Sequence, residues 1–133
     1  MQCFCGSGNK YQVCCSPLVE EQQSADNPEA LMRSRYSAYV VKQYQYIFNT
    51  YSAKHPDRPL SVDELREHAN GTTWLGLKIE KTSVAGDTGE VEFRAMYQVD
   101  NQLYQLHELS QFIKENHQWR YLSGRIFDDS GRL

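Results

Sequence analysis

The sequence lacks the features that mark several large classes of protein. It has no run of about 18 apolar residues, so no segment is predicted to span a membrane. It has no glycine-rich dinucleotide motif, no phosphate-binding P-loop and no nucleophile elbow, so the usual sequence signals of nucleotide-dependent enzymes and of hydrolases are missing. It also has no C-x-x-C pair, the pattern typical of a redox dithiol.

Strong charge of one sign is absent as well. The 133 residues include 14 Lys and Arg and 17 Asp and Glu, for a net charge of −3, and the basic residues are scattered. Broad nucleic-acid binding needs a basic stripe or patch, so we expect no strong nucleic-acid footprint. Cys3 follows Met1 so closely that no targeting peptide fits before it. We therefore expect a cytoplasmic protein without a membrane partner, in a compartment where thiols stay reduced.

Cysteine is confined to the first fifteen residues. The four cysteines follow the pattern C-x-C-x8-C-C, as Cys3, Cys5, Cys14 and Cys15. Close neighbours in such pairs are poorly placed to form a disulfide with each other, and a bridge between the pairs requires an oxidising compartment. Four thiolates complete a tetrahedral zinc site with no open position for a substrate. We predict Zn²⁺ bound by these four residues, with Lys10 as a nearby counter-charge.

The same stretch resembles the SEC-C motif, the small zinc knuckle at the C-terminus of the bacterial secretion motor ATPase. The matching residues are Cys3, Cys5, Gly6, Ser7, Gly8, Lys10, Tyr11, Cys14 and Cys15. Gln12 stands where the motif usually has lysine. The resemblance implies a structural zinc ion. In the secretion motor such knuckles contact a chaperone and the ribosome, so it also implies a protein or ribosome-associated partner.

Three parts are predicted along the chain: a zinc knuckle at 1–16, a polar linker at 17–27 and a main domain at 28–133. The linker shows no hydrophobic periodicity. Asn27 and Pro28 are suited to begin a helix, and an apolar stripe predicts that it continues to about Tyr51. Ser61 and Glu64 form a capping box that predicts a second, short helix, ending near 70–71.

From Thr73 onward the hydrophobic period changes to two, which predicts strands. Loops are indicated at 86–89, 100–101 and 116–117, so the third strand covers 103–114 and the fourth 118–126. The tail at 127–133 is predicted to be loose. Helices followed by consecutive strands predict an α+β fold, in which N-terminal helices pack on one face of a curved four-stranded antiparallel sheet.

Later blocks of the sequence resemble the YchJ family of small bacterial proteins. These blocks are residues 31–40, Trp74-Leu75-Gly76-Leu77, Val91-Glu92-Phe93-x-Ala95, His107-Glu108-x-Ser110-x-Phe112 and Trp119-x-Tyr121-x-x-Gly124. The resemblance implies a cone-like, nuclear transport factor 2-like main domain. Family members often carry a second SEC-C motif at the C-terminus, and this sequence ends at Leu133 without one. A role that needs two knuckles is therefore not expected.

The third strand carries the other candidate site. Glu108 and Ser110 share a face with Tyr104, Leu106 and Phe112. If that face is concave, the Glu108 carboxylate needs a partner, and Arg33 or Arg35 of the covering helix, near Tyr36, can supply one. The opposite register would expose Glu108 and bury Leu103, Leu109 and Ile113.

Two interpretations of this group remain open. It is either a buried ion pair that fixes how helix and sheet meet, or a pocket for a small polar ligand. His107 lies on the other face, and His55, His68 and His117 are expected at the surface.

We expect a non-catalytic adaptor whose knuckle contacts its partner, and we predict no catalytic residue. The alternative is a small-ligand binder or an enzyme that uses the pocket around Glu108. Zinc storage or sensing is a weaker alternative, because a cage of thiolates holds its metal too tightly for exchange.

Overall fold

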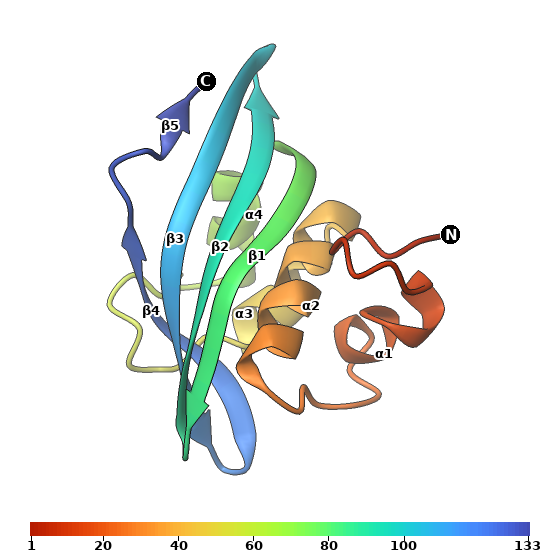
Figure 1. The fold of residues 1–133 in the computed structure, drawn as a ribbon, viewed down its shortest axis with the longest axis vertical. Coiled ribbons are helices and arrows are strands. Elements are labelled where there is room, and N and C mark those ends of the chain that lie inside the picture. Colours follow the sequence, from red (N-terminus) through yellow and green to blue (C-terminus); the bar gives the residue numbers. More distant parts are fainter.

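The computed structural model describes residues 1–133, and its centre is a four-stranded antiparallel sheet. Strands β1 (Thr73–Ala85), β2 (Thr88–Val99), β3 (Gln102–Glu115) and β4 (Gln118–Ile126) pair in the order of the chain. The sheet curves, and the helices lie on one side of it (Figure 1). The predicted α+β class and the predicted series of strands are therefore confirmed.

Two tight turns set the pairing of β2, β3 and β4. Asp100 and Asn101 have φ values of 49° and 63°, and Asn116 and His117 have values of 50° and 67°. Positive φ at both central residues is the mark of a type I′ turn, whose twist matches that of the flanking strands. Each turn thereby fixes which residues of the joined strands face each other.

Helix α2 (Pro28–Val41) covers the sheet and begins as predicted. The side chain of Asn27 accepts a 2.8 Å hydrogen bond from the Ala30 N–H, and Pro28 occupies the first turn. The start of the helix packs closely on β2, because a Cβ atom added at Gly89 would overlap the Pro28 ring. Gly89 therefore belongs to a strand contact and not to the predicted loop.

The predicted long helix is wrong in one respect, since it is divided into two. Helix α2 ends at Val41, Lys42 adopts a left-handed conformation with φ of 64°, and α3 (Tyr44–Asn49) follows in a new direction. The hydroxyl groups of Ser34 and Tyr46 lie 2.6 Å apart and join the two helices in the core. Lys42 does not mark the end of the helix in the sequence, because glycine is the residue that usually adopts this left-handed conformation.

Helix α4 (Val62–Ala69) agrees with its prediction. The Ser61 hydroxyl accepts a 3.1 Å hydrogen bond from the Glu64 N–H, which is one half of the capping box. Leu65 is buried, and Gly71 follows the helix with φ of 82°. No helix in the structure combines the length and the apolar composition that crossing a bilayer requires.

The N-terminal segment contains a 3-10 turn (η1, Tyr11–Val13) and helix α1 (Ser16–Val19), and it lies beside α2 (Figure 1). Leu18 and Val19 are buried in the same apolar cluster as Leu31. The start of the predicted linker is therefore helical and contributes to the core. The division of the chain at residues 16 and 27 stays a prediction, but the knuckle is not separate from the main body.

The tail is ordered, which corrects the prediction of a loose end. Strand β5 (Gly131–Arg132) pairs with β3 at Tyr104 and Gln105. The Leu133 N–H also donates a 2.9 Å hydrogen bond to the Leu103 carbonyl. The tail therefore covers part of the sheet edge that β4 leaves open.

Candidate functional site

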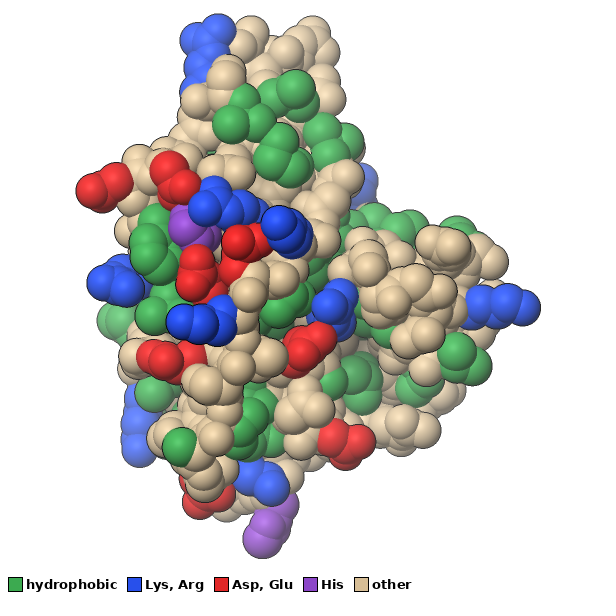
Figure 2. Space-filling view, in the orientation of Figure 1, with side chains coloured by type: hydrophobic (Ala, Val, Ile, Leu, Met, Phe, Trp, Pro, Cys, Tyr) green, Lys and Arg blue, Asp and Glu red, His purple; other side chains and the backbone are tan.

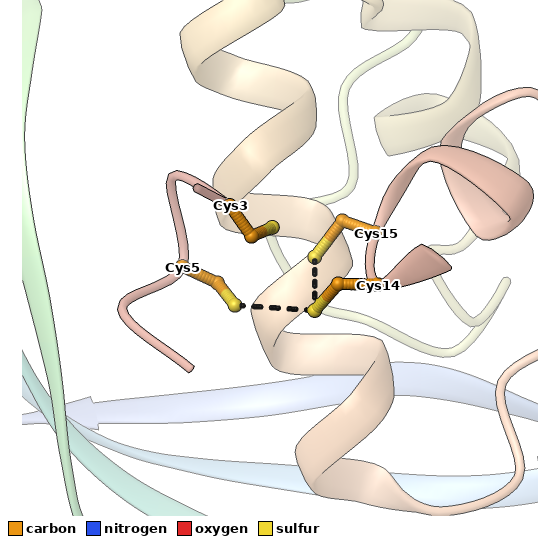
Figure 3. A group of neighbouring side chains, drawn as sticks. All are labelled: Cys3, Cys5, Cys14 and Cys15. Carbon is orange, nitrogen blue, oxygen red and sulfur yellow. Dashed lines mark hydrogen bonds between the residues drawn. The ribbon is translucent and has the colours of Figure 1, made fainter. Parts of the chain in front are cut away.

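The four cysteine side chains converge on one point. Their sulfur atoms all lie within 4.8 Å of one another, with 3.7 Å between Cys5 and Cys14 and 4.0 Å between Cys14 and Cys15 (Figure 3). All four are free thiols, far from the roughly 2.05 Å separation of a disulfide. A tetrahedral ion with sulfur bonds of about 2.3 Å would place its ligands about 3.8 Å apart. The cluster could therefore hold a metal ion.

A sharp reversal of the backbone brings the two cysteine pairs together. Gly6 and Gly8 have φ values of 80° and 87°, which side chains other than glycine rarely adopt. The Cys3 N–H closes the loop with a 2.8 Å hydrogen bond to the Asn9 carbonyl. A Cβ atom at Gly6 would lie 3.1 Å from the Leu77 carbonyl of β1, so the loop also needs this glycine to approach the sheet.

The cluster rests on α2. Cys3, Cys5 and Cys15 are buried, and Cys3 Sγ lies 3.6 Å from Oγ of the buried Ser37. On the other side Ser7 Oγ lies 3.2 Å from Cys14 Sγ. A hydroxyl group near a thiolate can donate a hydrogen bond to it, so Ser7 and Ser37 are placed to stabilise charge on the sulfur atoms.

The cation beside the cluster is Arg33 and not Lys10. Arg33 Nη1 donates a 2.8 Å hydrogen bond to the Cys5 carbonyl, and Arg33 Nε forms a 2.8 Å ion pair with Glu29. Lys10 is exposed and makes no side-chain hydrogen bond or ion pair. Arg33 was a candidate for the pocket around Glu108, but its side chain faces the cysteines instead.

Three of the thiols influence one another's ionisation. Interaction with the Cys15 thiol lowers the pKa of Cys5 to about 4, and the same interaction raises the pKa of Cys15. Burial raises the pKa of Cys14. The Cys5 thiol therefore ionises more easily than those of Cys14 and Cys15, and a cation that binds all three as thiolates must displace protons from the latter two.

The second candidate site centres on Glu108, which is only 8% exposed. Its Oε2 atom accepts a 2.5 Å hydrogen bond from Ser110 Oγ and a 2.7 Å hydrogen bond from the Tyr121 hydroxyl. Gly124 makes this meeting possible, because a Cβ atom there would collide with both the carboxylate and the phenol. The predicted ion pair is wrong, since no arginine lies within 4.0 Å of the Glu108 carboxylate.

The register predicted for β3 is confirmed by burial. Ser110 and Phe112 are each 1% exposed and face the helices with Glu108. Leu103 is 46% exposed, so the opposite register does not occur.

Arg35 finds its partners at the end of α3. Its Nη1 atom donates hydrogen bonds of 2.8 Å to the Ile47 carbonyl and 2.7 Å to Thr50 Oγ1. Its guanidinium carbon lies 4.5 Å from the ring centre of Tyr51 and 4.8 Å from that of Tyr121. Helix carbonyl groups and aromatic faces both attract a cation, so Arg35 is stabilised without a carboxylate.

A cavity of about 220 Å³ lies between α2 and the concave face of the sheet. Four of the predicted pocket residues line it, namely Arg35, Tyr36, Glu108 and Ser110, and Arg33 does not. A larger hollow of about 450 Å³ lies elsewhere, beside Trp119 and residues 21–25. The smaller cavity is the more suitable ligand site, because charged and aromatic groups converge on it.

The model for the middle, NTF2-like domain of YchJ matches residues 27–124. The chain belongs to the YchJ family. It is 40% identical to a UPF0225 protein of Geobacter sulfurreducens over 127 residues, which cover 92% of this chain and 77% of that one. It is 35% identical to a UPF0225 protein of Vibrio cholerae over 130 residues, which cover 95% of this chain and 83% of that one.

A solved structure extends the YchJ likeness to the N-terminal segment. The SEC-C motif containing protein of Rhodopseudomonas palustris superposes with a TM-score of 0.87 at 38% identity, covering 96% of this chain and 100% of that one. The resemblances to the SEC-C motif and to the YchJ family are thereby confirmed. This YchJ-family chain combines an NTF2-like fold with a cysteine cluster that could bind a metal.

One polar cluster of this YchJ-family chain has no counterpart among the sequence predictions. His107 is 6% exposed on the outer face of the sheet, with Nδ1 at 2.6 Å from Asp129 and Nε2 at 2.7 Å from Glu92. Arg94 pairs with Asp129 at 2.8 Å, and Phe127 stacks on the imidazole at 4.1 Å. Hydrogen bonding to Glu92, reinforced by Asp129, raises the pKa of His107, and Arg94 lowers that of Asp129.

The other histidines mostly follow their prediction. His68 and His117 are exposed, as expected. His55 is half-buried, with ring centres 5.1 Å from Tyr51 and 4.6 Å from Tyr121, so its surface placement is wrong.

Proposed function

We propose that this protein is a zinc-binding, non-catalytic adaptor, and that its knuckle, residues 1–16, binds a protein or ribonucleoprotein partner. The convergence of four cysteine sulfur atoms within 4.8 Å of one another carries this proposal. Three of the four cysteines are buried, so a bound ion would be enclosed and would act on structure and not on a substrate. The reducing conditions of the cytoplasm would keep the thiols free for metal.

Zinc is the metal that the donor set favours. Thiolates are soft ligands, and a tetrahedral set of four sulfur atoms selects zinc or an iron–sulfur centre. The spacings of 3.7 Å and 4.0 Å between sulfur atoms are close to those around a single ion with sulfur bonds of about 2.3 Å. Cys3, Cys5, Cys14 and Cys15 would be the ligands, and the metal would hold the two halves of the knuckle together.

The outer surface of the knuckle supports a protein partner. Val13 is 76% exposed and Met1 71% exposed, although both are apolar. In Figure 2 the N-terminal part, at the right of the view, shows mainly uncharged surface, whereas acidic and basic side chains mix over the sheet. The central parts of protein interfaces are poor in charge, so this surface suits contact with protein better than with phosphate groups. The resemblance to the secretion-motor knuckle favours a ribosome-associated partner.

Two matched substitutions test the adaptor role. Val13→Asp places a charge on the knuckle, and Leu60→Asp places the same charge at an 87% exposed site between α3 and α4. Tagged proteins would be used to capture partners from a bacterial lysate, and ribosomes would be separated by sedimentation. We expect about one zinc per chain for all three proteins, and loss of one specific partner with Val13→Asp only.

The alternative results are equally clear. Equal capture by Val13→Asp and the unchanged protein would contradict the adaptor role of this surface. Purified protein without bound metal, or with iron in place of zinc, would contradict the zinc assignment. A partner that sediments with ribosomes would identify the ribonucleoprotein version of the proposal.

A second candidate function, small-ligand binding, is favoured by the cavity beside Glu108. Its charged side chains and its aromatic side chains line the same cavity. This function does not depend on the knuckle, and one protein can have both.

A further inference from the structure

The Glu108 carboxylate has one oxygen atom available to a ligand. Oε2 accepts both hydrogen bonds, from Ser110 and from Tyr121, and Oε1 accepts none. The polar side-chain atoms that are both fully buried and without a partner are His55 Nε2 and Trp119 Nε1. Glu108 Oε1 is not among them, so it keeps some accessible surface, and Glu108 lines the cavity. It can accept hydrogen bonds from a ligand but can donate none while it is ionised.

The Arg35 guanidinium has a free edge. Only its Nη1 atom makes hydrogen bonds, to Ile47 and Thr50, and the rings of Tyr51 and Tyr121 cover its faces. Nε and Nη2 have no protein partner and keep some accessible surface, and Arg35 lines the cavity. A guanidinium edge of this kind suits the two oxygen atoms of a carboxylate.

Tyr121 contacts both the Glu108 carboxylate and the Arg35 guanidinium. Its hydroxyl donates to Glu108 at 2.7 Å, and its ring lies 4.8 Å from the Arg35 guanidinium carbon. The carboxylate and the guanidinium therefore face the same cavity as separate charges, each with part of its hydrogen-bonding capacity unused. Buried charges are costly unless they are paired. A ligand with a cationic group for Glu108 and an anionic group for Arg35 would pair both.

Most of the remaining lining is aromatic, with three aliphatic side chains, and the space is small. The lining includes Tyr36, Tyr39, Tyr51, Trp74, Phe93 and Tyr121. The volume of about 220 Å³ is below the range of about 300–1,000 Å³ typical of pockets for drug-sized ligands. The ligand must then be small and must present an apolar or aromatic body to these rings.

We propose that this cavity binds a small zwitterion of the amino-acid type with an apolar or aromatic body. Its ammonium group donates to Glu108 Oε1, its carboxylate accepts from Arg35, and its body packs on the aromatic walls. The inference rests on the second candidate function, small-ligand binding, and is independent of the knuckle. An amine without a carboxylate would leave Arg35 unpaired, and a carboxylate without an amine would face the Glu108 charge.

Three probes of similar size test the charge requirement on the unchanged protein. L-Phenylalanine carries both charges, phenethylamine lacks the carboxylate, and 3-phenylpropionate lacks the ammonium group. Calorimetric titration is expected to show binding of L-phenylalanine at least tenfold tighter than of either other probe. Chemical shifts should change at the Trp74 indole and Leu106 methyl groups of the cavity and not at Leu60, which is exposed elsewhere.

A pair of substitutions locates the ammonium contact. Glu108→Gln keeps the shape of the side chain and removes its charge. It should weaken the binding of L-phenylalanine at least tenfold and strengthen the binding of 3-phenylpropionate. Glu67→Gln removes an exposed carboxylate on α4 and should change neither. If Glu108→Gln does not fold, the comparison of the three probes on the unchanged protein still decides the matter.

The outcomes separate the two levels of the inference. If phenethylamine or 3-phenylpropionate binds in the cavity as tightly as L-phenylalanine, the proposed selectivity for a zwitterion is wrong, and small-ligand binding by the cavity is supported. If no probe perturbs the cavity at millimolar concentration, both are overturned. Binding of L-phenylalanine that perturbs only residues outside the cavity would overturn the site.

Discussion

Cys3 Sγ and Ser37 Oγ lie 3.6 Å apart, and both side chains are buried. The first cysteine is thus in contact with the middle of α2, the helix that covers the sheet. The cysteines also belong to the apolar cluster that includes Leu31, Ile47 and Phe112. Metal binding and folding of the main body are therefore expected to be linked, which the sequence prediction of a separate knuckle did not include.

Removing the metal should destabilise the whole chain. With free metal at 100 to 1,000 times its dissociation constant, binding to the folded state contributes about 2.7–4.1 kcal/mol. We expect Cys14→Ser, or treatment with a strong chelator, to lower the free energy of unfolding by about that amount in one cooperative transition. Calorimetry and near-UV circular dichroism measure it. Two separate transitions, with an unchanged main domain, would show that the knuckle unfolds alone.

Gly89→Ala should destabilise the contact between α2 and β2. The new Cβ atom would overlap the Pro28 ring and approach the Ser83 carbonyl. This overlap can be relieved only by a shift of the helix. Overpacking of this kind costs about 1–3 kcal/mol. Gly76→Ala is the matched control, because nothing lies within 4 Å of its added Cβ atom. Denaturant unfolding of both variants measures the difference, and equal stability would contradict the contact.

Tyr121→Phe should weaken the Glu108 site. The substitution removes the hydroxyl that donates to Glu108 Oε2 at 2.7 Å, and a hydrogen bond to a charged group contributes about 1.5–3 kcal/mol. Tyr97→Phe serves as the control, since the Tyr97 hydroxyl makes no hydrogen bond and its ring stacks on Tyr104. Thermal unfolding should show a loss for Tyr121→Phe only. Similar values for the two variants would mean that the Glu108 hydrogen bond contributes little.

Stability should decrease as pH rises through the titration of His107. The pKa of His107 is raised above its ordinary value by Glu92 and Asp129, and the Arg94 charge opposes this. A group with a raised pKa in the folded state stabilises it fully below the ordinary value of about 6.5, and the contribution is lost above the folded-state pKa. NMR titration of the ring should give a midpoint above 6.5. Asp129→Asn should bring the midpoint closer to 6.5, and a midpoint at or below it in the unchanged protein would contradict the prediction.

Local rules predicted the sheet and the starts of α2 and α4. Alternation placed the strands, and the two-residue turn at 100–101 sets the register in which Phe93 faces Glu108 and Arg94 faces His107. That pairing, with Glu92 on the same face, would have been enough to predict part of the His107 cluster, although it was not among the sequence predictions. Asp129 could not be predicted, because the fold of the tail depends on pairing with β3 and not on its own sequence.

The partners of the arginines depended on long-range packing. The break at Lys42 changes the direction of the chain, so that the end of α3 lies against Arg35. The residue type at position 42 does not predict this break. The register shift in the pairing of β3 with β4 likewise leaves Leu122 without a facing residue. A bulge of this kind comes from packing, so the approach of Tyr121 to Glu108 was not visible in the sequence.

Helix α2 carries Arg33 and Arg35 two positions apart, and the two side chains serve different sites. Arg33 holds the Cys5 carbonyl, and Arg35 lines the cavity. The same part of one helix thus contacts both sites, so a displacement of the helix at the cysteines would also change the geometry of the cavity. A coupling free energy acts equally in both directions. If the cysteines hold a metal and the cavity a ligand, as proposed above, the factor by which the metal raises the affinity for the ligand equals the factor by which the ligand raises the affinity for the metal.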